Sequence, residues 1–192
     1  MGQAKQKAAE MSIWLNSLTD KERIIHETAR ALFDKFIKPR NVTGMCYHSV
    51  FFLHENLKEK HGVTTEPVIG YVNDGTDDIM ISHAWLEYAG RKTDVSLAVT
   101  EHPDVSPAGQ LIVLDKVIKP GHKYNYHTQM TPAGLLALQT MRANGHHAIV
   151  EHKAAEHLTM VARAKNPDLI RAYLDAEPNG FDYEKITQII EA

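Results

Sequence analysis

The chain has 192 residues, and its 43% hydrophobic and 23% charged content is typical of a folded globular domain and excludes a disordered one. Its formal net charge of −3 gives no support for a nucleic-acid partner, and no apolar run approaches the roughly 18 residues of a membrane span. The single cysteine excludes a disulfide framework, and the N-terminal residues lack the apolar core of a secretory signal. We therefore expect one cytoplasmic domain with neither a nucleic-acid nor a membrane partner; the sequence does not indicate an oligomeric state.

Residues 1–40 predict N-terminal helices. The first part of this segment alternates Ala, Gln and Lys, which is typical of a helical arm. Thr19 and Glu22 form a capping box, in which the Thr19 hydroxyl accepts from the Glu22 N–H while the Glu22 carboxylate reaches back to Thr19. Apolar residues follow at helical spacing, at Ile25, Ala29, Leu32 and Phe36. We expect this second helix to end at Pro39, because proline cannot donate a backbone hydrogen bond.

The only cysteine, Cys46, opens the next predicted helix, directly after a short loop that contains Gly44. An apolar stripe continues from Cys46 at Val50, Leu53 and Leu57. His61-Gly62 is a plausible end for this helix, because glycine adopts the left-handed conformation of a C-terminal cap. The free N–H groups at a helix start carry partial positive charge, which favours a thiolate at Cys46.

The pattern then changes to that of strands. Residues 66–72 and 79–88 predict two strands, and a tight turn leads from the second into a third at residues 92–95. Two strands joined by so tight a turn must be antiparallel neighbours. Asp94 is therefore expected to run back beside His83 and to meet its side chain.

The rest of the chain divides into two parts. Residues 99–130 predict loops with short strands at 110–114 and 116–118, and the histidine- and tyrosine-containing stretch 122–127 is expected to be a loop. Residues 131–192 predict a helical C-terminal part, because cap residues, prolines and glycines delimit its segments. These helices are expected at 131–144, 147–164, 167–176 and 182–190. No internal repeat or linker divides the chain, so we expect a single α+β domain.

Cysteine, histidine and aspartate, in this order, are the parts of a nucleophile, a base and an orienting acid. Three fragments, Gly44-Met45-Cys46-Tyr47, His83-Ala84-Trp85-Leu86-Glu87 and Asp94, resemble the transglutaminase-like superfamily of papain-type cysteine enzymes over residues 41–98. The resemblance implies a nucleophile-bearing helix packed on an antiparallel sheet, with Cys46 as nucleophile, His83 as base and Asp94 as its partner. It implies a cysteine-dependent amide or peptide hydrolase, or an acyl transferase, that acts on a peptide or protein amide through a thioester acyl-enzyme and needs no cofactor or metal.

Further residues are candidates for binding the substrate or its oxyanion. The Cys46 N–H, with a second donor from the loop between Asn41 and Gly44, is expected to stabilise the oxyanion. Tyr47 and His48 follow the cysteine on the same helix, and Trp85 lies two residues beyond His83 on the predicted strand. His48 is a candidate for the cleft mouth, and Trp85 for the core or the wall of the cleft.

Two other interpretations remain open. A non-catalytic module on the same scaffold would use the groove to hold a peptide or protein, and it would not need a thiolate at neutral pH. A metal-dependent hydrolase would use the histidine-rich helix, whose candidate ligands are His147, Glu151, His152, Glu156 and His157. Its three histidines advance five residues at a time and do not share one face, so a solvated helix face is favoured over a metal site.

Overall fold

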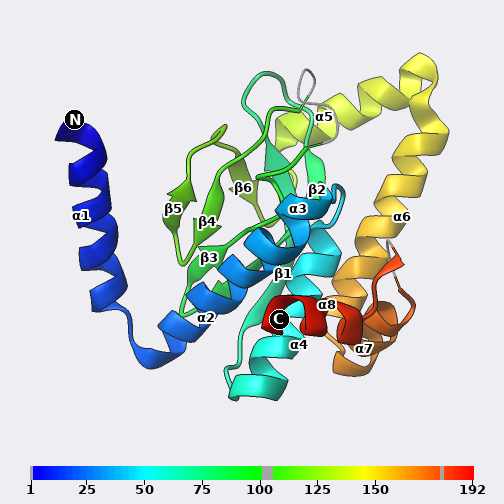
Figure 1. The fold of residues 1–192 in the computed structure, drawn as a ribbon. Coiled ribbons are helices and arrows are strands. Elements are labelled where there is room, and N and C mark those ends of the chain that lie inside the picture. Colours follow the sequence, from blue (N-terminus) through cyan, green and yellow to red (C-terminus); the bar gives the residue numbers. More distant parts are fainter. Residues whose placement is uncertain (1, 101–105, 178–179) are drawn as a thin grey trace.

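The computed structural model describes residues 2–100, 106–177 and 180–192, so residues 101–105 of the predicted 99–130 region lie outside the described part. It is an α+β structure (Figure 1). The helices are α1 (Gly2–Ser17), α2 (Asp20–Ala31), α3 (Lys38–Arg40), α4 (Cys46–His61), α5 (Pro132–Met141), α6 (His147–Ala164), α7 (Pro167–Asp175) and α8 (Tyr183–Glu191). The strands are β1 (Glu66–Asn73), β2 (Ile81–Tyr88), β3 (Arg91–Thr93), β4 (Leu111–Val113), β5 (Lys116–Lys119) and β6 (Asn125–His127).

The main sheet is antiparallel, with the strand order β3-β2-β1-β6. A second pair, β4-β5, joins it through a bridge between Asp94 and Ile112 that continues β3. The prediction of a loop at 122–127 is wrong for its last three residues, because β6 pairs with β1 and places His127 opposite Tyr71. A strand of three residues carries too short an alternation to be recognised before its partner is known.

Helix α4 lies at the centre of the core. It contacts β1, β2, α2 and α7, and Val50 and Leu53 of α4 belong to the same buried cluster as Ala84 and Leu86 of β2. The stripe predicted for the second helix is confirmed, since all four of its residues are fully buried. The capping box at Thr19 is also present, and Gly62 ends α4 in the left-handed conformation as expected.

The second helix does not end at Pro39 as predicted. It continues beyond α2 through a π-helical segment, Leu32–Ile37, into α3, and it ends at Asn41, whose φ is 48°. Pro39 cannot donate to the carbonyl of Lys35, four residues earlier, but the Arg40 guanidinium donates to that carbonyl at 2.9 Å. The wider π turn and this side-chain bond together accommodate the proline.

Two helical segments stand away from the main body, on opposite sides of it (Figure 1). One is α1, whose residues are mostly exposed. The other is the α5–α6 arm, in which α5 and α6 are joined by a π-helical segment, Arg142–His146, with a kink at Gly145, where φ is 89°. The later part of α6 returns to the main body, where it contacts β1 and α7. Among the described residues, no helix is long and apolar enough to cross a membrane.

Candidate active site

Strand β2 and the end of β3 bring His83 and Asp94 into contact. The tight turn pairs Leu86 with Thr93, and the next residue, Asp94, accepts a hydrogen bond from His83 Nε2 at 2.6 Å. Both residues are buried, with 4% and 1% of their surface exposed. The contact expected from the strand order is therefore present.

Asp94 is held by donors on both carboxylate oxygens. Oδ2 also accepts from the Tyr126 hydroxyl at 2.7 Å, and Oδ1 accepts from the Ser96 N–H and hydroxyl, both at 3.0 Å. Burial by itself raises the pKa of Asp94, but the His83 charge and these hydrogen bonds outweigh burial and lower it. The carboxylate is thus kept ionised and fixed in orientation.

The Cys46 thiol, half-buried at the start of α4, adjoins the His83 side chain. Because Nε2 faces Asp94, Nδ1 is the nitrogen left for the thiol. Burial opposes protonation of His83, but the charge of Asp94, its hydrogen bond and the interaction with Cys46 raise the pKa of His83 to about 10. The ring is therefore an imidazolium at neutral pH, between a carboxylate and a thiol.

The start of α4 supplies backbone donors beside the thiol. The first backbone bond of the helix runs from the Ser49 N–H to the Met45 carbonyl at 2.8 Å, so the N–H groups of Cys46 and Tyr47 have no partner within the helix. No side chain in the described part of the chain caps this end. These N–H groups are suited to an oxyanion that forms at a carbon attacked by Cys46.

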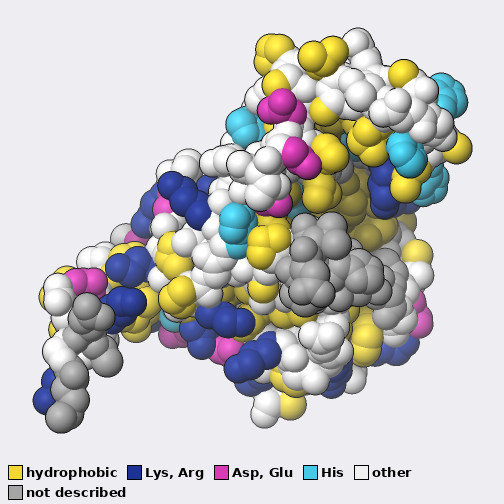
Figure 2. Space-filling view, turned by 90° about the horizontal axis from the view of Figure 1, so that it is seen from above, with side chains coloured by type: hydrophobic (Ala, Val, Ile, Leu, Met, Phe, Trp, Pro, Cys, Tyr) yellow, Lys and Arg dark blue, Asp and Glu magenta, His cyan; other side chains and the backbone are white. Residues whose placement is uncertain are grey.

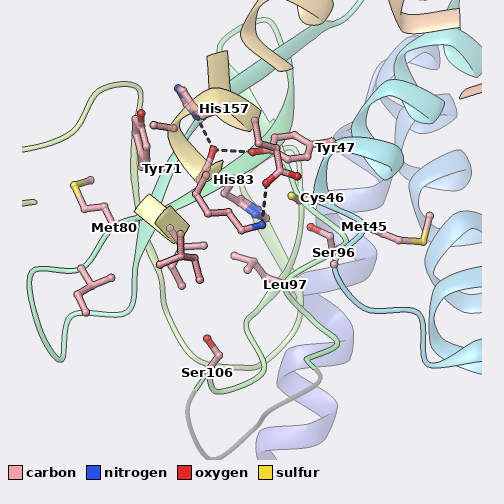
Figure 3. A pocket seen from close by; sticks show the side chains of 18 of the residues that line it. Met45, Cys46, Tyr47, Tyr71, Met80, His83, Ser96, Leu97, Ser106 and His157 are labelled. Carbon is pink, nitrogen blue, oxygen red and sulfur yellow. Dashed lines mark hydrogen bonds and ion pairs between the residues drawn. The ribbon is translucent and has the colours of Figure 1, made fainter. Parts of the chain in front are cut away.

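A cavity of about 810 Å³ opens in front of Cys46 and His83. It lies between the sheet and the α5–α6 arm, and the space-filling view shows hydrophobic side chains around this hollow (Figure 2). Cys46, His83 and Ser96 lie at one side of it, and Tyr71 and Met80 at another (Figure 3). Gly44 and Tyr47, two of the predicted binding residues, also line it.

A second hydrogen-bonded group spans the cavity wall from α4 to α6. The Ser82 hydroxyl bonds the Tyr47 hydroxyl at 2.7 Å and His157 Nδ1 at 2.5 Å, as the dashed lines in Figure 3 indicate. The His157 ring also stacks on Tyr71, with 4.4 Å between ring centroids. Burial lowers the pKa of His157, so this histidine is neutral at pH 7.

Three of the predicted binding residues do not reach the cavity. Asn41 is exposed at the end of α3, on the far side of the loop from Gly44. His48 is fully buried with its ring edge-on to Tyr173 at 6.1 Å, because one residue beyond Tyr47 turns by about 100° around the helix. Trp85 is buried against Gly70, and its indole N–H donates to Glu87 at 2.7 Å.

The histidine-rich helix does not assemble a metal site. Within the residues described, no group of three or more His, Cys, Asp or Glu side chains is arranged to hold an ion. His157 is bonded to Ser82, and Glu151 pairs with Arg142 at 2.9 Å. The metal-dependent alternative therefore gains no support from the geometry.

Tyr126, Ser82 and His157 belong to the site, but the sequence pattern does not predict this. Tyr126 comes from β6, which was expected to be a loop, and its only signal was the alternation of His122, Tyr124 and Tyr126 along a strand-like stretch. His157 was considered only as a possible metal ligand. Its contact with Ser82 joins residues 75 positions apart, which no local pattern predicts.

Comparisons with models of protein families, with curated proteins and with solved structures found no significant match for this chain. What the site does is therefore inferred from its own chemistry.

Proposed function

We propose that this protein is a cysteine-dependent enzyme that hydrolyses amides or transfers their acyl group, on a scaffold of the transglutaminase-like, papain-type kind. The observation that carries the proposal is the contact between His83 and the buried Asp94 carboxylate, next to the thiol at a helix start. This contact raises the pKa of His83 and keeps the ring charged at neutral pH. An imidazolium beside a thiol stabilises the thiolate, which is the nucleophilic form of cysteine. Cys46 is the nucleophile, His83 the acid and base, and Asp94 its orienting partner.

The reaction begins when the Cys46 thiolate forms a C–S bond to the carbonyl carbon of an amide. The carbonyl electron pair moves to oxygen, where the N–H groups of Cys46 and Tyr47 stabilise the negative charge. As this intermediate collapses, the C–N bond breaks and the leaving nitrogen takes a proton from the His83 imidazolium. The acyl group is then held as a thioester on Cys46.

A second nucleophile resolves the thioester. Water attacks the carbonyl carbon, and His83, now neutral, accepts the proton that the water loses. The C–S bond breaks, the carboxylic acid leaves, and the thiolate and imidazolium are restored. An amine in place of water gives acyl transfer by the same steps.

The proposal is tested by alkylating Cys46 with iodoacetamide at about pH 6 and about pH 9, using glutathione as a reference thiol. From about pH 9 down to about pH 6, the alkylation rate of glutathione falls by about a hundredfold or more. An ordinary thiol with a pKa near 8.5 loses its thiolate form over this range. We expect the wild-type rate to fall less than about tenfold, because His83 stays charged up to about pH 10.

The variant His83→Gln keeps an N–H that can reach Asp94 but removes the cation, and Cys46→Ala provides the unlabelled blank. In His83→Gln the rate at about pH 6 is expected to fall toward that of the reference thiol. A folded wild-type protein whose rate follows glutathione would rule out the catalytic proposal. The site would then be better explained as a non-catalytic module that holds a peptide or protein in the same groove.

A further inference from the structure

The wall of the cavity on the α5–α6 arm is mainly apolar. Its apolar side chains from α5 and α6 are Leu138, Met141, Ile149, Val150, Ala154 and Leu158. Facing segments contribute Ile79, Met80 and Met130. Methionine side chains are flexible and polarizable, so a lining that contains several adapts to apolar ligands of irregular shape.

Most polar groups of the lining lie near the thiol or are paired with one another, and the hydroxyl residues Thr100 and Ser106 line it as well. The Ser82 hydroxyl bonds both Tyr47 and His157, and the Ser96 hydroxyl donates to Asp94. The two charged side chains on α6 that line the cavity, Lys153 and Glu156, form an ion pair at 2.8 Å. The cavity thus has a polar reacting end, and its lining toward the α5–α6 arm is mainly apolar.

Two leucines of similar exposure on the arm differ in their position relative to the cavity. Leu158 of α6 lines it with 67% of its surface exposed, while Leu136 of α5 is 63% exposed and lies outside the lining. Ile149, at 56%, is also both exposed and part of the lining. Apolar ligand atoms in the cavity would cover Leu158 and Ile149 but not Leu136.

The chemistry of these walls distinguishes a hydrocarbon chain from a polypeptide. An extended peptide carries an N–H and a C=O at every residue, and each needs a partner when it leaves water. Along α5 and α6 the backbone groups are used within the helices, so those walls present only side chains. A hydrocarbon chain has no polar groups to satisfy, and the cavity volume of about 810 Å³ is within the range of ligand sites.

We propose that the apolar part of this cavity binds a long hydrocarbon chain, so that the acyl donors are amides of long-chain carboxylic acids. This substrate class rests on the proposed acyl-transfer function: the carbonyl lies at Cys46 and the chain extends toward the α5–α6 arm. The hydrocarbon chain of the substrate supplies binding energy, and the leaving amine of the substrate lies on the side toward solvent.

Alkyl chloromethyl ketones test the substrate class, because Cys46 displaces their chloride to form a stable C–S bond while the alkyl group takes the place of the acyl chain. We expect the second-order rate of Cys46 labelling to rise about threefold per methylene from methyl to about nonyl, the effect of moving each group out of water. The ratio of the nonyl to the methyl rate is expected to fall at least tenfold in Leu158→Lys, while Leu136→Lys retains it.

The outcomes separate the substrate class from the function. Rapid Cys46 labelling at a rate that does not vary with alkyl chain length overturns the substrate class but not the proposed function. The same holds if an apolar peptidyl chloromethyl ketone labels Cys46 faster than the alkyl ketones do. Calorimetry measures the binding of decanamide to the Cys46→Ala variant, in which no turnover can occur. Decanamide that binds no more tightly than acetamide overturns the substrate class, whereas tight binding with an unreactive thiol retains the chain site and overturns the function.

Discussion

The cavity has a buried histidine on each of two walls, and one of these histidines is charged at neutral pH while the other is neutral. On the sheet, His83 bonds the Asp94 carboxylate, and its pKa is raised to about 10. On α6, His157 bonds the neutral Ser82 hydroxyl and stacks on Tyr71, and burial lowers its pKa. Both rings are buried, but only His83 has a carboxylate as its partner.

Burial alone therefore does not decide whether a histidine in this cavity is charged or neutral. Removing a ring from water disfavours its charged form at both positions. At His83 the adjacent negative charge outweighs that penalty, and the result is an acid beside a thiol. At His157 no charged partner among the described residues offsets the penalty, and the result is a neutral ring that ties α6 to the sheet.

The largest expected effect comes from removing the carboxylate, which would make His83 resemble His157. In Asp94→Asn the charge is lost while the shape is kept, so burial lowers the pKa of His83 and the ring is neutral at pH 7. We expect iodoacetamide labelling of Cys46 at about pH 6 to fall about a hundredfold. Denaturant unfolding is expected to show a loss of about 3 kcal/mol, because a buried ion pair is broken.

Asp115→Asn is the matched control for this substitution. The Asp115 carboxylate is half-exposed and lies 4.0 Å from Lys92, so removing its charge is expected to change stability by less than about 1 kcal/mol. It should leave the labelling rate unchanged. Equal labelling rates in Asp94→Asn and Asp115→Asn would contradict the role given to Asp94.

A smaller effect is expected from Tyr126→Phe, which removes one of the donors to Asp94. The lost hydrogen bond goes to a charged acceptor, so the free energy of unfolding should fall by about 2 kcal/mol. The His83 resonances, followed by NMR, should titrate at a different pH from wild type, because the carboxylate that holds the proton has changed.

Tyr124→Phe is its control. The Tyr124 hydroxyl donates to the Pro107 carbonyl at 2.8 Å, a neutral acceptor, so its loss is expected to cost about 1 kcal/mol. It should not change the titration of His83. If both phenylalanine variants shift that titration equally, Tyr126 acts on the fold and not on Asp94.

The smallest effect concerns pH and His157. Because the folded state lowers the pKa of His157, the unfolded chain binds a proton below about pH 6.5 that the folded chain does not, and stability falls as pH falls. In His157→Gln this dependence between about pH 7 and pH 5 should be weaker, by about 1 kcal/mol. Thermal unfolding of wild type and His157→Gln at about pH 7 and about pH 5 measures this difference. An identical pH dependence of stability in the two proteins would contradict a neutral His157.

His83 should give the opposite dependence. Its raised pKa means that the folded chain holds a proton which the unfolded chain releases above about pH 6.5, so its contribution to stability is lost as pH rises toward 10. Wild type should therefore lose more stability than His83→Gln between about pH 7 and pH 9. A larger loss in the variant would contradict a charged His83.

Much of the fold was predictable because its signals are local. Capping residues, apolar stripes and turns delimit the helices and most strands, and each depends on residues a few positions apart. Even the contact of His83 with Asp94 was predictable, because the tight turn between their strands leaves only an antiparallel pairing. The end of the second helix one residue past Pro39 was not predicted, and there the Arg40 guanidinium donates to the Lys35 carbonyl.

Local sequence patterns were therefore enough to predict most helices, the β2–β3 hairpin and the contact of His83 with Asp94. The residues that surround this pair depend on how distant elements pack together. Tyr126 reaches Asp94 across 32 positions, and Ser82 reaches His157 across 75. The cavity between the sheet and the α5–α6 arm likewise combines segments far apart in the chain. Such contacts are set by how whole elements pack together, and the spacing of residues within one element carries no record of that packing.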